Sequence, residues 1–260
     1  MSHTSIYNTP DHDLLRDQDY RRRFRKSFDK KVLGPTLWHR DFHDSTIVEC
    51  PDKSLVGKSF GQIADERGSH PLDAFLDVLV EHGERNTRWT TIVANHRPKQ
   101  LDKLAKEPSV HMGFSDAGAH LRNMAFYNYA LRMLRRVHDA DKSGKPFMTT
   151  EHAVHRLTGE VADWFGLEAG TLRQGERADF VVIDPAGLNA ELEAYHEDSV
   201  EFYGGLSRMV NRSDSAVVAT GVGGQVVFRD GDFREGYGET VKSGHYLPAR
   251  GVKLPVAQPV

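Results

Sequence analysis

The sequence predicts an α/β fold, and two patterns along its 260 residues point to that class. In the middle of the chain, short apolar runs alternate with segments whose apolar residues recur every three or four positions. This alternation of strand and helix is typical of parallel sheets, because a helix returns the chain to the start of the next strand. Near the C-terminus, two apolar runs flank Gly223-Gly224, which is the strongest hairpin signal in the chain.

Composition narrows the class of protein. The chain has 34 Lys and Arg against 37 Asp and Glu, so no basic surplus points to nucleic acid or to a membrane surface. Cys50 is the only cysteine, which excludes an internal disulfide and a cysteine-based zinc site. No apolar run is long enough to span a bilayer, and no apolar signal core is seen. We therefore expect a cytoplasmic protein with no nucleic-acid or membrane partner.

The N-terminal region shows no obvious packed element before about residue 32. Its basic run, Arg21–Lys26, is interpreted as a solvated helix face rather than a phosphate site. His39 and His43 are four residues apart and could share a metal if they lay on a helix. A strand expected directly afterwards, at Thr46–Cys50, disfavours that interpretation.

Further expected elements follow in order. Ser59 and Gln62 have the spacing of a capping box, and Pro71 suits the first position of the next helix. Expected helices cover 60–67, 71–82, 98–107, 121–139 and 150–165, with expected strands at 90–94 and 110–114. In the last helix, the packing face is expected at Val154, Leu157, Val161 and Trp164, with His152 and His155 structural or solvent-facing.

The character of the chain changes after residue 165. Expected strands at 178–183, 216–222 and 225–229 are separated by glycine-rich turns, which predicts a small β unit. We therefore expect two domains, residues 1–165 and residues 166–260, the second ending in a tail rich in Gly and Pro.

The chain is organised around the stretch Val110–His120, in which an expected strand stops at Asp116 among small residues. In a barrel of parallel strands, an acid at the C-terminal end of a strand lies where active sites are built. The competing interpretation is that Asp116 only caps the helix that follows.

Two motifs resemble a known family. The first is Phe114-Ser115-Asp116-Ala117-Gly118-Ala119-His120, and the second is Gly166-Leu167-Glu168-Ala169-Gly170-Thr171-Leu172-Arg173-Gln174-Gly175-Glu176-Arg177-Ala178-Asp179-Phe180-Val181-Val182-Ile183-Asp184. Together they resemble the C-terminal portion of the amidohydrolase superfamily, in particular its N-acyl-D-amino-acid deacylase (D-aminoacylase) branch. The resemblance covers roughly residues 35–235.

This resemblance implies the C-terminal part of a metal-dependent (β/α)₈ TIM barrel followed by a small β-sandwich. It implies one or two divalent metals, zinc in the first place, and a small-molecule amide substrate such as an N-acyl-D-amino acid. Asp116 matches the family's strand-eight acid, which binds the metal and takes the proton of the metal-bound water. Ser115, His120 and Asn95, which follows the expected strand 90–94, are assigned as substrate contacts.

The sequence also departs from the family. No two histidines are separated by one residue, so the His-x-His of strand one is absent. Counterparts of the first five strands are missing, and a barrel needs all eight strands to close. We therefore expect a C-terminal fragment that is inactive alone and works only with an upstream barrel-completing chain or segment.

Two other functions stay open at this point. The chain could be a catalytically inactive scaffold or partner subunit that keeps the amidohydrolase fold. It could also be a complete small α/β enzyme of another kind, although no Ser-His-Asp or Walker-type pattern is present.

Overall fold

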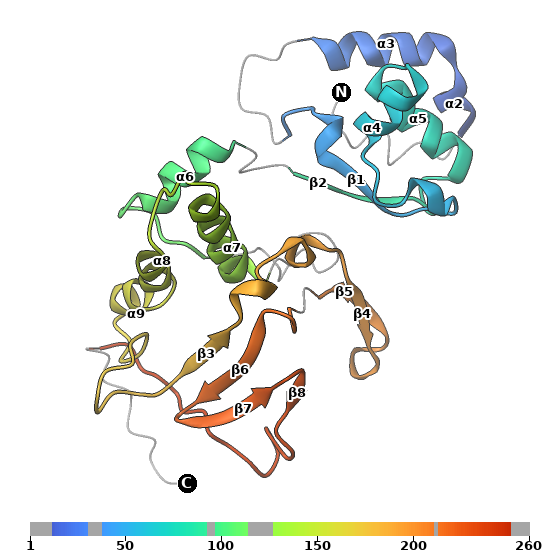
Figure 1. Ribbon diagram of the computed structural model, residues 1–260. Helices are drawn as coiled ribbons and strands as arrows, with labels where there is room; N and C mark the ends of the chain where they lie inside the picture. The colour runs from blue at the N-terminus through green and yellow to red at the C-terminus, as the bar shows by residue number, and fades with distance from the viewer. Residues whose placement is uncertain (1–11, 31–37, 93–96, 114–126, 211–212, 251–260) are drawn as a thin grey trace. The chain divides into compact units, whose positions relative to one another are not determined.

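The computed structural model describes residues 12–30, 38–92, 97–113, 127–210 and 213–250 (Figure 1). Helices and strands are mixed in this part of the chain, which is consistent with the α/β class. The chain forms two compact units, Met1–Leu101 and Asp102–Val260. The predicted domain boundary after residue 165 stays a prediction.

Local signals set the helices of the first unit, as the sequence predicts. Ser59 and Gln62 form a reciprocal capping box at the start of α4, and Pro71 is the first residue of α5. The helices of this unit are α2 (His12–Arg16), α3 (Gln18–Asp29), α4 (Phe60–Arg67) and α5 (Pro71–His82), with 3₁₀ turns η1 (Phe42–Asp44) and η2 (Lys53–Leu55).

The strands of the first unit pair differently from the expectation. β1 (Ser45–Glu49) and β2 (Arg88–Thr91) form an antiparallel pair, so the expected parallel arrangement is not found between them. The chain between them makes two helices and returns along the opposite direction, and Ser45 Oγ and Thr91 Oγ1 lie 2.9 Å apart across the pair. The barrel portion of the prediction therefore has no support from this pairing.

An aromatic cluster forms the centre of the first core. The ring of Phe60 is fully buried and meets those of Phe75 and Trp89 edge to face, at centroid distances of 5.0 and 5.7 Å. The ring of Phe42 also contacts that of Phe75, in a tilted arrangement with a centroid distance of 5.3 Å. The β1 residue Ile47 completes this layer with no exposed surface.

The expectation of no packed element before residue 32 is wrong. Helix α3 lies along α5, where Arg21 pairs with Asp77 at 2.6 Å and Arg25 with Asp73 at 3.3 Å (Figure 1). Three of its aromatic residues recur every fourth position and pack on the core, although charged residues lie between them in the sequence: Tyr20, Phe24 and Phe28. The basic run is thus partly a packed face with acidic partners.

Helix α6 (Pro98–Lys106) leads to the stretch on which the sequence analysis centred. Residues 110–113 form no strand, so the expected strand 110–114 is wrong in its described part. The Val110 amide donates to the Glu107 carbonyl at 3.1 Å, which makes a turn. The Val110 carbonyl accepts from Arg156, so neither group is available to a neighbouring strand.

The helices of the second unit are α7 (Tyr129–Lys142), α8 (Thr150–Leu157) and α9 (Gly159–Phe165). The expected helix 150–165 is broken at Thr158, whose φ and ψ of −128° and −86° are not helical. Its predicted packing face is right at Leu157, which packs against the second core, but wrong at Val154 and Trp164, which are exposed, while Ala153 and Arg156 are buried. His152 and His155 face solvent, as expected.

The second unit contains two separate antiparallel sheets. The predicted hairpin is confirmed: β6 (Val217–Val222) and β7 (Gln225–Arg229) are joined through Gly223 and Gly224, both with positive φ. The larger sheet has the order β3-β6-β7-β8, with β3 at Phe180–Ile183 and β8 at Asp232–Phe233. The smaller one pairs β4 (Glu197–Val200) with β5 (Leu206–Met209). The 3₁₀ turns η3 (Pro185–Gly187), η4 (Ala190–Glu193) and η5 (Glu201–Tyr203) complete the unit.

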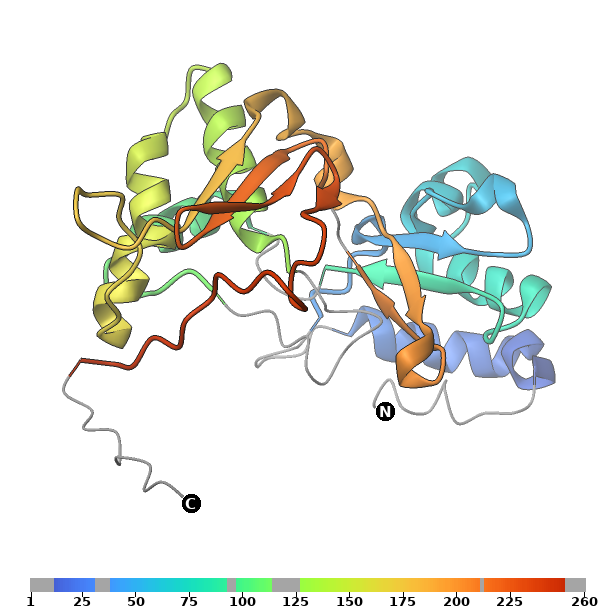
Figure 2. The same cartoon turned by 90° about the horizontal axis from the view of Figure 1, so that it is seen from below.

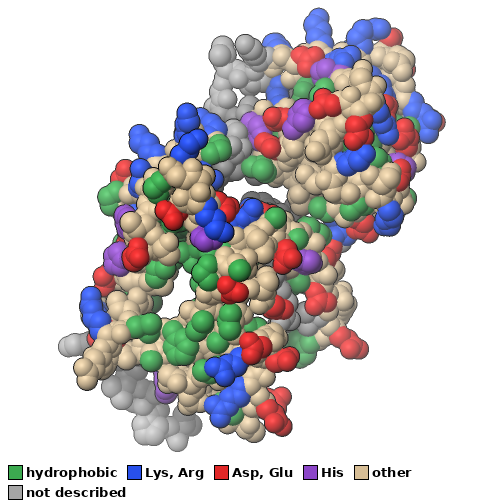
Figure 3. Space-filling model, viewed as in Figure 1, with side chains coloured by type: hydrophobic (Ala, Val, Ile, Leu, Met, Phe, Trp, Pro, Cys, Tyr) green, Lys and Arg blue, Asp and Glu red, His purple; other side chains and the backbone are tan. Residues whose placement is uncertain are grey.

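The second core lies between the helices and the larger sheet. Figures 1 and 2 show α7, α8 and α9 gathered on one side of that sheet. Its buried members include Val137 of α7, Ala153 of α8 and Leu192 of η4. Apolar side chains are also exposed on the sheet strands, among them Val181, Val182 and Phe233 (Figure 3). In the described part of the chain, every helix falls short of the length and apolar content that a membrane crossing needs.

Candidate functional site

The predicted site residues lie outside the described residues. Asp116, Ser115 and His120 belong to 114–126, and Asn95 belongs to 93–96. Their assignment as metal ligand and substrate contacts therefore stays a prediction. The structure does describe the segment 107–113 that leads to Asp116, and the helices that contact this segment.

The lead-in segment 107–113 is held by side chains of α8 and α9. Arg156 of α8 donates from Nη1 to the Glu107 carbonyl at 3.0 Å and from Nη2 to the Val110 carbonyl. Glu160 of α9 lies 3.5 Å from His111 Nδ1, measured from its Oε1 atom. The His111 ring stands over that of Trp164, with centroids 4.8 Å apart. Both helices thus fix the chain shortly before Asp116.

Arg156 and Glu160 were not singled out from the sequence. An arginine in a helix is normally expected to be exposed to solvent. Arg156 and Ala153 are the buried residues of α8, and the small side chain of Ala153 is a weak indication of an inward face. No residue pattern indicated that an arginine would be buried there.

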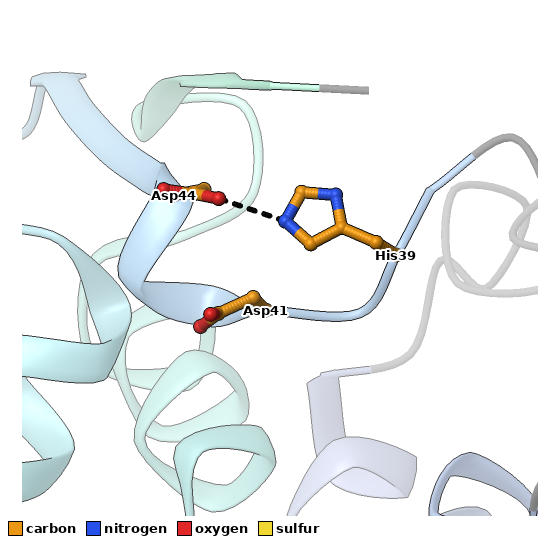
Figure 4. Close-up of side chains that lie close together, drawn as sticks. All are labelled: His39, Asp41 and Asp44. Carbon is orange, nitrogen blue, oxygen red and sulfur yellow. Dashed lines mark hydrogen bonds and ion pairs between the residues drawn. The ribbon is translucent and has the colours of Figure 1, made fainter. Parts of the chain in front are cut away.

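A second group of chemically active side chains lies before β1. His39, Asp41 and Asp44 each offer one ligand atom, and these atoms lie within 4.8 Å of one another. Figure 4 shows the His39 imidazole pointing at Asp44, and its Nε2 lies 2.8 Å from Asp44 Oδ2. His43 is not part of this group, in keeping with the sequence analysis, which disfavoured a metal shared by His39 and His43; the short η1 turn begins only at Phe42.

His43 instead stands between two carboxylates. Its Nε2 lies 3.0 Å from Asp65 Oδ2 and its Nδ1 lies 3.1 Å from Asp41 Oδ1. The hydrogen bond with Asp65, followed by that with Asp41, raises the pKa of His43 above its ordinary value. The pKa of Asp41 is lowered, first because its carboxylate accepts the backbone N–H of His43 at 2.9 Å.

The group His39–Asp41–Asp44 does not fit a closed zinc site. Its donor types suit zinc, but structural zinc takes four protein ligands, and three side chains of one loop are at hand. Asp41 already caps η1, and Asp44 Oδ2 already accepts a hydrogen bond from His39 Nε2. Metal binding would require those contacts to be broken, so no chemical step is assigned here.

A pocket of about 450 Å³ lies beside α7 in the second unit. Its cations, Arg132, Arg135 and Arg136, all come from α7. They are matched by carboxylates: Arg136 Nε lies 2.6 Å from Asp102 Oδ1, and Glu193 contacts both other arginines. The paired charges leave this pocket without a net attraction for an anionic ligand.

Comparison with known proteins adds the family. The model of a family described as "Amidohydrolase family" matches residues 59–228. Uncharacterised proteins of Mycobacterium tuberculosis strain H37Rv and of Mycobacterium bovis are 71% identical over 241 residues. The match covers 91% of this chain and 39% of each relative, so the chain spans well under half of their length.

Solved structures were matched at a lower level. A D-aminoacylase, and an N-acyl-D-glutamate deacylase from Bordetella bronchiseptica complexed with zinc and a phosphonate inhibitor, are each 20% identical with a TM-score of 0.39. Each match covers 74% of this chain and 36% of the other chain. A TM-score of this size does not establish a shared fold. The family match, in contrast, covers more than half of the 260 residues, and by it the chain belongs to the amidohydrolase family.

Proposed function

We propose that the chain supplies the carboxylate Asp116 to a metal-dependent amidohydrolase that cleaves a non-peptide C–N bond. The observation that carries the proposal is the family match over residues 59–228, which contains the stretch Phe114–His120. The substrate class that suits it best is an N-acyl-D-amino acid, the class of compound that the resemblance implies.

Asp116 has two tasks in this proposal. As a carboxylate it is a ligand of a divalent metal, and its second oxygen accepts a proton from the attacking water and passes it to the leaving nitrogen. A bound zinc ion would polarise the scissile carbonyl and make water acidic enough to ionise near neutral pH. Ser115, His120 and Asn95 contact the substrate in the same proposal.

The remaining metal ligands are proposed to come from polypeptide outside these 260 residues. One carboxylate cannot hold zinc, and the described side chains bring together only the His39 group as a set of three. The same polypeptide would complete a (β/α)₈ barrel and would place a second β layer on the exposed apolar side chains of the larger sheet. Val181 and Phe233, 53% and 67% exposed, favour such a cover.

The test joins this chain to the parts of the M. tuberculosis relative that lie outside the matched 241 residues. With zinc, the joined protein is expected to hydrolyse N-acetyl-D-amino acids, while the 260-residue chain alone is expected to be inactive. Asp116→Asn is expected to lower kcat by roughly 10²- to 10⁴-fold, because general acid–base catalysis supplies that range. The exposed Asp163→Asn is the matched control and should behave as the unchanged protein.

A non-catalytic scaffold is the second candidate, and the missing His-x-His favours it. Zinc stoichiometry separates the two functions. A joined protein that neither binds zinc tightly nor hydrolyses any amide would support the scaffold, and unchanged activity in Asp116→Asn would overturn the role of that residue. Zinc-dependent hydrolysis by the 260-residue chain alone would show that the ligands all lie within it.

A further inference from the structure

Arg156 is the largest fully buried side chain in the described part of the chain, with 1% of its surface exposed. An arginine cannot lose its proton in a protein, so this burial places a permanent charge inside the second unit. Such burial is costly unless polar groups surround the guanidinium. The partners of Arg156 therefore indicate what the residue does.

Those partners lie far away in the sequence. The Glu107 and Val110 carbonyls, 49 and 46 residues before Arg156, accept from its two terminal nitrogens. The Glu107 carbonyl also accepts the Val110 amide at 3.1 Å, so the arginine holds both ends of one turn. A planar guanidinium with its donors in a fixed fork is suited to bind two carbonyls at a set spacing.

The hydrogen bonding of the guanidinium is incomplete. Glu160, one turn later, forms an ion pair with Arg156 Nη2 at 3.6 Å, beyond hydrogen-bond distance, and Arg156 Nε has no hydrogen-bond partner among the described residues. An apolar side chain of similar volume would fill the space without this desolvation. Stability alone therefore does not account for an arginine at this position, whereas the two carbonyl contacts do.

Glu160 extends the anchoring by one residue. It faces His111, which follows the turn directly, and His111 rests on the exposed ring of Trp164. Residues of α8 and α9 thus contact the segment 107–111 at the Glu107 carbonyl, the Val110 carbonyl and the His111 side chain. Residue 113 is the last described residue before Asp116, and the anchored residues Val110 and His111 come shortly before it in the sequence.

We infer that Arg156 is a positioning residue of the proposed hydrolase: it fixes the turn 107–110, which comes six residues before Asp116 in the sequence. This inference rests on the proposed function for its catalytic part. The anchoring itself rests on the contacts of Arg156 alone.

Hydrogen exchange of the 260-residue chain tests the anchoring. In Arg156→Met, peptides covering 107–113 are expected to exchange roughly tenfold faster or more, because hydrogen bonds to a charged group are lost there. Peptides from β6 and β7 should be unchanged. Arg173→Met, at an arginine whose side chain is 77% exposed, is the matched control and should match the unchanged protein everywhere.

Arg156→Lys keeps the charge but lacks the planar fork, so its exchange is expected to lie between the two. If Arg156→Met does not fold, the exchange of Arg156→Lys over residues 107–113 tests the anchoring instead. Equal exchange over 107–113 in Arg156→Lys and the unchanged protein would overturn the inference, as would faster exchange spread evenly over the second unit.

Kinetics of the joined protein test the catalytic part. Arg156→Met is expected to lower kcat about 10- to 100-fold with KM changed less than about twofold, and Arg156→Lys should recover part of the loss. A raised KM at constant kcat would contradict positioning. If the joined protein has no activity at all, the proposed function fails, while the exchange experiment still decides whether Arg156 anchors the turn.

Discussion

Replacing Phe60 by alanine is expected to remove about 3–5 kcal/mol from the free energy of unfolding of the first unit. Phe60 has no exposed surface, and its ring meets those of Phe75 and Trp89 at 5.0 and 5.7 Å. Truncation leaves a cavity between rigid aromatic rings that cannot close in, and it also removes the edge-to-face contacts. We therefore expect a loss in the upper half of that range.

Urea unfolding followed by tryptophan fluorescence measures this loss, since Trp89 lies against Phe60. With a slope of about 1–3 kcal/mol per molar urea, the midpoint should fall by roughly 1–5 M while the slope stays the same. Phe202→Ala is the control, because Phe202 is 88% exposed and its loss should cost under about 0.5 kcal/mol. Equal midpoints for Phe60→Ala and the unchanged protein would refute the aromatic cluster as the centre of this core.

Three further predictions concern single residues. Because the pKa of His43 is raised in the folded state, the stability that His43 contributes is complete below about pH 6.5 and is lost as the pH rises through the folded-state pKa. The difference in urea midpoint between the unchanged protein and His43→Gln should therefore shrink from pH 5.5 to pH 8.5. A constant difference would contradict the raised pKa of His43. Ser59→Ala removes one half of the capping box of α4 and should cost about 1 kcal/mol in the same urea experiment, whereas Ser54→Ala, at an exposed serine, should cost less. Gly187→Ala would place a methyl group 2.1 Å from a backbone oxygen of Ser215, so the melting temperature should fall by several degrees, and an unchanged melting temperature would argue against that close approach.

Local signals predicted the helices and the hairpin well. The capping box at Ser59, Pro71 at the start of α5 and Gly223-Gly224 in the hairpin each determine a boundary through their own backbone chemistry. Strand direction was not predictable in the same way. The partner of β1 lies some forty residues away, and nothing within either strand states whether the pair runs parallel or antiparallel.

Burial was harder to predict where apolar residues stand among charged ones, and where a charged residue is itself buried. Helix α3 presents Tyr20, Phe24 and Phe28 to the core between charged neighbours, so its polarity suggested a solvated segment. Arg156 is the opposite case, a charged residue that faces inward. The carbonyl groups that Arg156 contacts belong to the turn at Glu107 and Val110. Because these partners lie 46 and 49 residues earlier, no pattern near Arg156 in the sequence could predict the contacts.

For the candidate site, too, the sequence predicted the motif but not the contacts between residues far apart in the chain. The motif around Asp116 and the family match agree on the amidohydrolase family, because both depend on the residues themselves. A metal pair of His39 and His43, which the sequence disfavoured, is not formed, since the chain makes a short 3₁₀ turn there and no helix. In its place, His43 bridges Asp41 and Asp65, and the second carboxylate belongs to α4, 22 residues later.

The packing of α3 has a practical consequence for anyone who shortens this protein. The family match begins at residue 59, yet the first core already contains Leu15, Phe42 and Ile47. A protein cut at residue 59 would keep Phe60 and Phe75 but lose the groups that shield them from water. Such a fragment would present an aromatic surface that favours aggregation, so expression trials should place the first residue before α2.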